Sequence, residues 1–502
     1  MKKRYTSVGF YNNQITCVSM RFTRVAGLCL LFALLLSTPA NAQNYRSIIA
    51  APLNWTSASS WEVQIGNNWF PSTSYPGQNP GTGTVIIRDF SVVTININIS
   101  PANQIGELVV GEGTGGVLQF DNANRTLNIG SGGVIVNANA TFQFGNAAQT
   151  LTVNGGSVQV NAGGIFQFGN APQTLTVNNG GSVIVNADGI FQVTSAAPST
   201  THTINITGGG SFRNDGTVNF RIVSSGGITD VANLNLSGNL AGTGTSTFNN
   251  IQFNGTTNQT ITIGGTVAIN GTVATTVQFN NTGTAPNNQI INQSVAFTNA
   301  ISVTPDRTTF TAGNYVHNVN ATYLVSNASI TIPAAMTVTV QQGTMNFAHG
   351  NANPPPVLTL NGNLVIDGGT VNAGVNTSAT FETANALLMG GVNASITLNG
   401  GELNVGNTNT GFGNLRMNAD NQSVTVTGGT LRTERWVIGS GSADNQTVTI
   451  DGGLVQILPT VTTTNRVALQ FVQGTLVMNG GQMRIGENLT AITGSNLEPF
   501  FI

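Results

Sequence analysis

The chain has 502 residues, and only 7% of them are charged. Ordinary soluble domains carry about 25% charged residues, and a surface helix needs a charged face, so this composition excludes a mainly helical protein. Valine, isoleucine, leucine and phenylalanine recur at regular positions, which argues against a disordered chain.

Residues 1–42 have the features of a secretory signal peptide. Two arginines precede the apolar stretch Val25–Leu36, and the small residues of Ala40–Ala42 form a cleavage site. The apolar stretch is too short to span a bilayer. Because Met20 lies where such a signal normally begins, we expect residues 1–19 to be an upstream extension.

Removal of the signal peptide changes the charge of the chain. It takes away five of the 16 basic residues and none of the 18 acidic ones, so the mature chain has a net charge of −7 and no lysine. Such a chain lacks the clustered positive charge that nucleic acids and anionic membranes require. Both cysteines, Cys17 and Cys29, also leave, which excludes disulfides and cysteine-bound metals. We expect a secreted or cell-surface protein with no membrane-spanning segment.

The region after the signal peptide, residues 43–105, is rich in aromatic residues. Its first part carries three of the four tryptophans of the chain together with a tyrosine: Trp55, Trp61, Trp69 and Tyr75. A stack of strands needs a cap at each end, because an open strand edge invites aggregation. We therefore expect these aromatics to plug the first turn. A sugar-binding aromatic patch is the alternative.

Residues 134–192 repeat with a period of 24 to 25 residues. Equivalent positions are Val134, Val158 and Val183, and likewise Phe142, Phe166 and Phe191. A fixed period of this length indicates stacked repeats. Within each copy apolar residues alternate with polar ones, which predicts short strands that bury one face. Asn- and Gly-rich segments separate them, and these residues tolerate the backbone of tight corners.

Three strands and three corners in about 24 residues predict one turn of a parallel β-helix, and the repeat length favours a right-handed one. Each strand then pairs with its equivalent in the next turn. We expect a phenylalanine stack inside and two amide ladders outside, formed by Gln143, Gln167 and Gln192 and by Asn137, Asn161 and Asn186. A chain of separate β-sandwiches is the rival architecture.

The pattern returns in the second half of the chain. Gly-Gly pairs start at Gly368, Gly400, Gly428, Gly452 and Gly480, with steps of 32, 28, 24 and 28 residues. We assign residues 106–352 and 353–502 to two β-helix segments of 24–32 residues per turn, joined at the proline-rich stretch 353–357. Few residues follow the last repeat, and we expect the natural chain to continue beyond Ile502.

The tryptophan-rich opening, the "YPG" after it and the Gly-Gly-punctuated repeats resemble large secreted β-helix surface proteins of Gram-negative bacteria. These include filamentous-haemagglutinin-like adhesins, autotransporter passengers and type IX-secreted repeat proteins. The resemblance implies a protein of the cell surface or outer membrane, or a released one, with an adhesive role. The chain departs from these families in having no recognisable β-barrel translocator or C-terminal sorting domain.

The densest group of polar residues follows Leu431. Registered on the Gly-Gly pairs, Arg432 faces outward in line with residues of the next two turns, Gln456 and Arg484, and a corner follows with Glu434, Arg435 and Trp436. β-Helix lyases and hydrolases of polysaccharides place acidic and basic residues on such a face, and a tryptophan can stack on a sugar. The corner is therefore a candidate glycan-binding site. The alternative is a solvated corner with a partly buried tryptophan.

Other candidate residues are isolated. The three histidines, at 202, 317 and 349, have no neighbouring ligand residues, and we expect them on the surface. Asp420 and Asp444 lie in matching corners, where they could bind calcium between turns or hydrogen-bond their own turn. Outward threonines stack in two places: Thr150 and Thr152 with Thr174 and Thr176, and Ser423 and Thr425 with Thr447 and Thr449.

These observations predict a secreted β-solenoid with a structural or adhesive function, no catalytic residues, no cofactor and no metal. Its partners would be surface glycans or molecules of a host or matrix, reached through many weak contacts. A carbohydrate-active β-helix enzyme centred on Arg432, Glu434 and Trp436 is the first alternative. Ice binding by the threonine arrays is the second.

Overall fold

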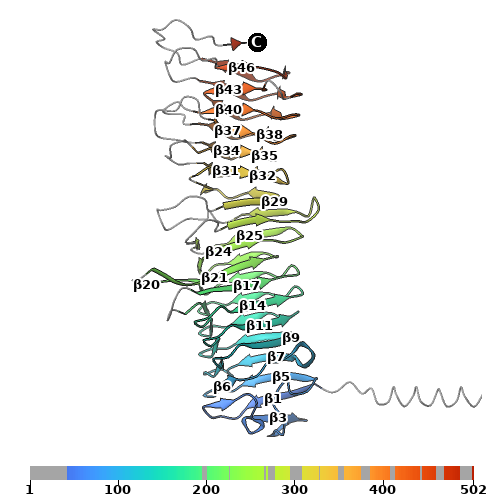
Figure 1. Cartoon of the computed structure of the whole chain (residues 1–502), viewed down its shortest axis with the longest axis vertical. Coiled ribbons are helices and arrows are strands. Elements are labelled where there is room, and N and C mark those ends of the chain that lie inside the picture. The colour runs from blue at the N-terminus through green and yellow to red at the C-terminus, as the bar shows by residue number, and fades with distance from the viewer. Residues whose placement is uncertain are drawn as a thin grey trace, which may run out of the picture.

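The computed structural model is a β-solenoid of about 13 turns, with 55% of residues in strands and 2% in helices. Its turns stack along one long axis, as Figure 1 shows. The structure describes residues 42–194, 200–224, 227–264, 267–269, 277–293, 308–326, 328–348, 356–374, 385–406, 413–440, 444–458, 468–486 and 500–501. Of the predicted signal peptide, residues 1–41 therefore lie outside the described residues.

One turn contains three strands, as the repeat predicts. In one turn of the first half these are β11 (Gln149–Asn154), β12 (Val158–Val160) and β13 (Ile165–Gln167). Each pairs in parallel with its equivalent in the next turn, β14 (Thr174–Asn178), β15 (Val183–Val185) and β16 (Ile190–Gln192). The three columns of paired strands are three flat faces of the solenoid, and the prediction of a parallel β-helix is confirmed.

The first half is built on these three columns. The first continues through β17 (Thr200–Ile206), β21 (Gly227–Leu236), β24 (Asn250–Phe253) and β27 (Val277–Asn280). The second continues through β18 (Phe212–Asn214), β22 (Leu240–Gly242), β25 (Gln259–Ile263) and β28 (Gln289–Asn292). The third is β2 (Leu53–Asn54), β6 (Val92–Ile95), β8 (Val117–Phe120), β10 (Thr141–Gln143), β13, β16, β19 (Thr217–Asn219), β23 (Thr245–Phe248) and β26 (Val267–Ile269).

The N-terminal turns use longer strands. A parallel ladder runs through β1 (Gln43–Ser47), β5 (Thr82–Ile87), β7 (Ile105–Val110) and β9 (Arg125–Val136), and β9 pairs with both β11 and β12. Antiparallel strands β3 (Trp61–Ile65) and β4 (Asn68–Pro71) continue this sheet past β1 at the N-terminal end. Two short 3₁₀ helices, Ala58–Ser60 and Pro101–Asn103, precede β3 and β7. One hairpin projects from the stack, where β20 (Arg221–Ser224) pairs antiparallel with β21 (Figure 1).

The second half continues from β29 (Thr308–His317), whose first residues pair with β27 and whose last pair with β28 and β32. Sheet A, which contains the first two columns, then runs through β32 (Met336–Val340), β35 (Asn363–Ile366), β38 (Ser395–Leu398), β41 (Ser423–Val426), β44 (Thr447–Ile450) and β47 (Thr475–Met478). Sheet C comprises β30 (Thr322–Leu324), β33 (Thr344–Phe347), β36 (Thr370–Ala373), β39 (Glu402–Val405), β42 (Thr430–Thr433), β45 (Leu454–Ile457) and β48 (Gln482–Ile485).

Sheet D completes these turns with β31 (Ile330–Ile332), β34 (Leu358–Leu360), β37 (Asn385–Met389), β40 (Asn414–Met417), β43 (Arg435–Ile438), β46 (Leu469–Phe471) and β49 (Phe500–Phe501). Residues 353–355 of the predicted joint lie outside the described residues. The strands on either side of them, β31 and β34, pair in register. The change from two sheets to three falls at β29–β31.

The core follows the predicted stack of phenylalanines. Phe142, Phe166 and Phe191 are fully buried and lie directly opposite one another in adjacent strands. The rings of Phe142 and Phe166 stack with centroids 4.7 Å apart, whereas the ring of Phe191 is turned edge-on to Phe166 at the same separation. Both geometries are favourable for aromatic pairs. The buried apolar residues of successive described turns thus form one continuous core.

The predicted amide ladders run along the outside. The side-chain amide of Gln167 donates to Gln143 at 2.8 Å, and that of Gln192 donates to Gln167 at 3.4 Å. At the corner, Asn161 donates to Asn137 and Asn186 donates to Asn161, both at 2.8 Å. Because an amide both donates and accepts, identical neighbours can bond repeatedly along the stack, which identical charges cannot do.

Candidate functional site

The aromatic residues of the N-terminal region take up two different positions. Trp55 and Trp61 are buried at the end of the core, with edge-to-face rings 4.9 Å apart. The Trp55 indole N–H donates to the Pro76 carbonyl at 2.8 Å, and that of Trp61 donates to the Trp55 carbonyl at 2.7 Å. A buried indole N–H needs such a partner. These two tryptophans are therefore part of the packed end of the solenoid and are not presented to a sugar.

Trp69 and Tyr75 lie further out. Trp69 is on the edge strand β4, partly exposed, and the guanidinium of Arg46 lies 4.6 Å from its ring centre. Arg46 also pairs with Glu62 at 2.6 Å. Tyr75 is partly buried against the core. The four aromatics therefore do not form a single exposed patch, and Trp69 already has a cation on its ring.

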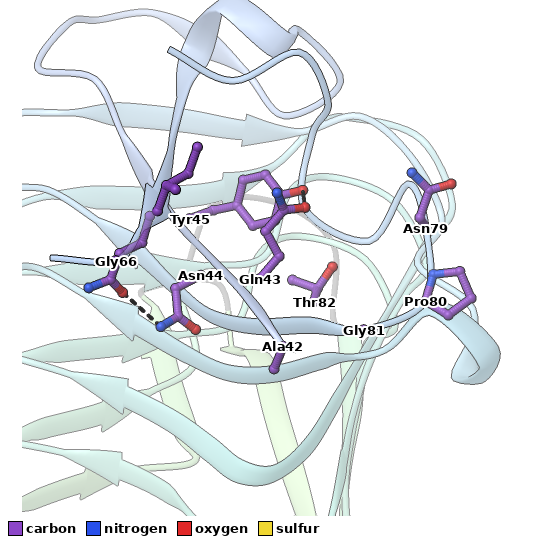
Figure 2. A pocket seen from close by; sticks show the side chains of 11 residues that line it. Ala42, Gln43, Asn44, Tyr45, Gly66, Asn79, Pro80, Gly81 and Thr82 are labelled. Atoms are coloured by element: carbon purple, nitrogen blue, oxygen red, sulfur yellow. Dashed lines mark hydrogen bonds between the residues drawn. The ribbon is translucent and has the colours of Figure 1, made fainter. Parts of the chain in front are cut away.

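A polar hollow of about 620 Å³ lies beside β1 (Figure 2). Its lining includes Asn44, whose amide donates to Gln64 at 2.9 Å, and Tyr45, whose hydroxyl donates to Gln43 at 2.7 Å. The 11 lining residues include no carboxylate, histidine, lysine or arginine, and they supply amides and hydroxyls as hydrogen-bonding groups. Ala42, on one side of the hollow, is the last residue of the predicted signal peptide.

The row of residues predicted around Arg432 is present. Arg432 lies opposite Gln456 in the next turn, and Gln456 lies opposite Arg484. The guanidinium of Arg432 donates to Gln456 at 3.0 Å and contacts the carboxylate of Glu402 at 3.1 Å. Its third contact is with the side-chain oxygen of Asn404, 3.3 Å away. Arg432 is therefore held by residues of the turns on both sides.

Glu402 and Asn404 are polar partners of Arg432 that the sequence did not single out. Asn404 lies directly opposite Arg432, and Glu402 lies opposite Thr430 two positions earlier, so its carboxylate reaches Arg432 diagonally. When the sequence is aligned on the Gly-Gly pairs, both residues fall one turn before Arg432. This alignment could therefore have identified them as neighbours of Arg432. An arginine paired in this way supports the sheet, and it also reduces the positive charge available to a ligand.

Among the described residues, the side chains at the corner after Arg432 contact different partners. Glu434 accepts a hydrogen bond from the backbone N–H of Gly413 at 3.1 Å, and Arg435 donates to Gln470 at 2.6 Å. Trp436 is fully buried inside sheet D, opposite Leu415 and Leu469. The expectation that this tryptophan could stack on a sugar is therefore wrong, because strand alternation turns it inward after the outward Arg435.

The histidines correct a second expectation, since His202 and His317 are not surface residues. His202 is fully buried, neither of its ring nitrogens has a hydrogen-bond partner, and its ring stacks on Phe168 at 4.8 Å. Burial lowers the pKa of His202 to about 4. His349 lies outside the described residues. An unpaired histidine in the core is neutral at physiological pH and packs as an aromatic ring.

His317, the last residue of β29, belongs to a buried polar cluster at the point where the solenoid changes from two sheets to three. Its Nε2–H donates to the Ala321 carbonyl at 3.3 Å, and its Nδ1 lies 3.4 Å from the hydroxyl of Tyr315, which accepts from Asn292 at 3.1 Å. Burial lowers the pKa of His317 and raises that of Tyr315. The side chains of His317 and Tyr315 are buried and neutral, and their hydrogen bonds stabilise the fold.

Asp420 and Asp444 bond to the next turn. Asp420 accepts from the backbone N–H of Asp444 at 2.9 Å, and Asp444 accepts from the side chain of Gln473. Among the described residues, no three histidine, cysteine, aspartate or glutamate side chains lie close enough together to hold a metal ion. The sequence left two roles open for these aspartates, calcium binding or hydrogen bonding. The structure shows hydrogen bonds, and both of them join one turn to the next.

The two threonine arrays differ in extent. In the first half, Thr150 and Thr174 lie in a row that Thr126 and Thr203 extend on either side. The row beside it is only two threonines deep, since asparagines precede Thr152 and follow Thr176. The array in the second half is longer and forms the outer face of sheet A.

The chain has no counterpart among the proteins with which it was compared: no protein-family model, no curated protein and no solved structure matches it. In the part of the chain that the structure describes, we find no helix that could form a membrane span. The class that the geometry defines is therefore the parallel β-solenoid.

Proposed function

We propose that this protein is a secreted, non-catalytic β-solenoid that acts as a structural or adhesive stalk at the cell surface. The observation that carries the proposal is the ladder of in-register parallel strands, which continues through about 13 turns. Such a stack is a rigid rod whose polar faces repeat along its length. A repeating face suits many weak contacts with an extended partner better than one strong contact with a small molecule.

The ionisable side chains support this proposal, since those with the closest contacts serve the fold. Asp121 and Arg125 form an ion pair at 2.6 Å, and the hydrogen bond from Arg125 holds the pKa of Asp121 below its ordinary value. Arg213 pairs with Asp215 at 2.6 Å. Catalysis requires such groups to converge on a substrate position. Here Asp121 pairs with Arg125 four residues further along the chain, and Arg213 pairs with Asp215 two residues further along.

Export and surface display are the first part of the test. The full precursor is expressed in a Gram-negative host, and the mature N-terminus is determined by sequencing. We expect it to be Gln43 and the protein to be degraded by protease added to intact cells. A precursor that keeps residues 1–42 and stays in the cytoplasm would contradict the proposal.

Binding without turnover is the second part. Purified residues 43–502 are tested against arrays of polysaccharides and matrix proteins, and each bound polysaccharide is assayed for new reducing or unsaturated ends. We expect binding with no new ends. Release of such ends, abolished by Arg432→Ala with Glu434→Gln, would establish the carbohydrate-active alternative instead. Circular dichroism of the variant shows whether the fold is retained.

A further inference from the structure

The outer surface of sheet A in the second half carries two parallel rows of short side chains. The first row is Thr337, Asn363, Ser395, Ser423, Thr447 and Thr475, and the second is Thr339, Val365, Thr397, Thr425, Thr449 and Val477. Thr339 is itself buried and donates to Asn314 at 3.1 Å, so the accessible part of the second row begins at Val365. We call these two rows the Ser/Thr face. Ten of its 12 residues carry a hydroxyl or an amide, and none of them is ionisable.

The Ser/Thr face is a regular lattice of polar groups. Adjacent strands of a sheet lie about 4.8 Å apart, and alternate residues of one strand are separated by about 6.7 Å. The strict register of β38, β41 and β44 therefore repeats these two spacings over three full turns with hydroxyls at every position. Flanking turns continue the lattice with Asn363 and Thr475.

The side chains of this lattice are held rigidly. The inward neighbours of the central rows, such as Val424, Val426 and Val448, are fully buried. Threonine is branched at Cβ, so its χ1 angle is restricted in a strand. The Ser395 hydroxyl is further fixed by donating to the side chain of Asn363 at 2.7 Å. Groups fixed in this way lose little conformational entropy when they order a ligand.

The other two outer faces of these turns lack this regularity. Sheet C exposes long or charged side chains, including Glu402, Arg432 and Arg484. Sheet D has a mixed row that contains Leu388, Arg416 and Gln470. Carboxylates near the Ser/Thr face, such as Asp451, lie at the corners, where Asp451 accepts from Asn479 at 2.7 Å. The lattice is therefore confined to one face of the stack.

We propose that the Ser/Thr face binds ice. Its ligand should be uncharged, periodic in two directions and small in its repeating unit, since the 12 residues of the face include no charged and no aromatic side chain. A water lattice has these properties, because each hydroxyl can both donate to and accept from water. The threonine methyl groups between the hydroxyls leave room for ordered water without competing for its hydrogen bonds. The inference rests on the proposed extracellular location, where the protein would meet ice.

The test uses the purified mature chain, residues 43–502. We expect a gap between its freezing and melting points, and we expect fluorescently labelled protein to enter a growing ice hemisphere. The variant Thr425→Tyr with Thr449→Tyr places two large rings at the centre of the face and should reduce both signals to the level of a buffer with an inert protein. The control Thr370→Tyr with Thr430→Tyr makes the same change on sheet C and should keep both.

Several outcomes would overturn the inference. The first is a wild-type chain that is excluded from ice and shows no gap between its freezing and melting points. The second is a variant Thr425→Tyr with Thr449→Tyr that binds ice as well as wild type. The third is a control variant on sheet C that loses ice binding while its circular dichroism is unchanged. Failure here is separable from failure of the proposed stalk function, because export and surface display are measured on cells without ice.

Discussion

The buried side chain of Gln173 holds the backbone of Gly169 at a corner of the solenoid. Its Oε1 accepts from the Gly169 N–H at 2.7 Å, and its Nε2 donates to the carbonyl of Gly145 in the preceding turn at 2.6 Å. Equivalent contacts are made in other turns by Gln149, Gln259 and Gln422. The recurring glutamine therefore fastens these four corners to the turn before them.

We expect Gln173→Leu to lower the free energy of unfolding by about 2–3 kcal/mol, because it leaves a buried N–H and carbonyl without partners. The matched control is Gln167→Leu, which makes the same change in the half-exposed outer ladder and should cost less than about 1 kcal/mol. Equilibrium unfolding in denaturant measures both. Equal losses in the two variants would contradict the role assigned to Gln173.

The strand register could be predicted from the sequence because each turn of a solenoid is the template for the next. The spacing of the phenylalanines gave the pairing of Phe142 with Phe166, and the Gly-Gly pairs gave the alignment of Arg432 with Gln456. The role of the repeated glutamine was not predicted. Its position in the pattern was visible, but a corner residue that turns inward looks the same in sequence as one that faces solvent.

The direction of side chains near corners could not be predicted for the same reason. The chain turns sharply after Glu434, so the alternation restarts and Trp436 points into the core. His202, by contrast, continues the inward alternation of Ile204 and Ile206 in strand β17, so its burial could have been predicted from the period of two. Contacts across a diagonal, as between Arg432 and Glu402, need the relative positions of adjacent turns and cannot be derived from one strand alone.

The asparagine ladder makes a prediction about charge. Asn161 donates to the side-chain oxygen of Asn137 and accepts from Asn186 and from Gln159. The substitution Asn161→Asp keeps the acceptor but sets a carboxylate against the Asn137 oxygen, so we expect a loss of about 1–3 kcal/mol at pH 7. The folded pKa of this carboxyl would be raised, since only its protonated form can donate to Asn137.

The loss in Asn161→Asp should therefore shrink as the pH falls towards 4, where the carboxyl becomes protonated and restores the donor. Thermal unfolding at pH 4 and pH 7, compared with wild type at each pH, measures the difference. The neutral variant Asn161→Gln carries no ionisable group and serves as the control. A deficit of Asn161→Asp that is independent of pH would show that the ladder bond to Asn137 is unimportant.

The second glycine of the Gly-Gly pairs is required by close packing between turns. Gly429 has a φ of +71°, and a Cβ at this position would lie 2.4 Å from the carbonyl oxygen of Gly401. Gly209 has a φ of +83° and no atom within 4 Å of a Cβ. We expect Gly209→Ala to cost about 1–2 kcal/mol from backbone conformation alone.

Gly429→Ala adds a clash with a backbone atom that cannot move without disturbing the neighbouring turn, so we expect a loss of at least about 3 kcal/mol. Denaturant unfolding of the two variants separates the two effects. A loss for Gly429→Ala no greater than that for Gly209→Ala would mean that adjacent turns can separate at this corner at little cost.

The buried His202 links stability to pH. Burial lowers its pKa to about 4 in the folded chain, whereas an unfolded histidine titrates near 6.5. As the pH falls through 6.5, this histidine becomes protonated in the unfolded chain but stays neutral in the folded chain. The free energy of unfolding should therefore decrease between pH 6.5 and pH 4, with a slope of up to about 1.4 kcal/mol per pH unit from this residue.

The variant His202→Phe tests this linkage. Phenylalanine can fill the same space against Phe168 and removes both the proton and the unpaired ring nitrogens. We expect it to raise stability at pH 7 and to reduce the pH slope, while the remaining slope includes the contribution of His317, whose pKa burial also lowers. Unfolding curves at pH 4.5, 5.5 and 7.5 measure the slope. Parallel pH profiles for the variant and the wild type would mean that His202 takes up its proton without leaving the core.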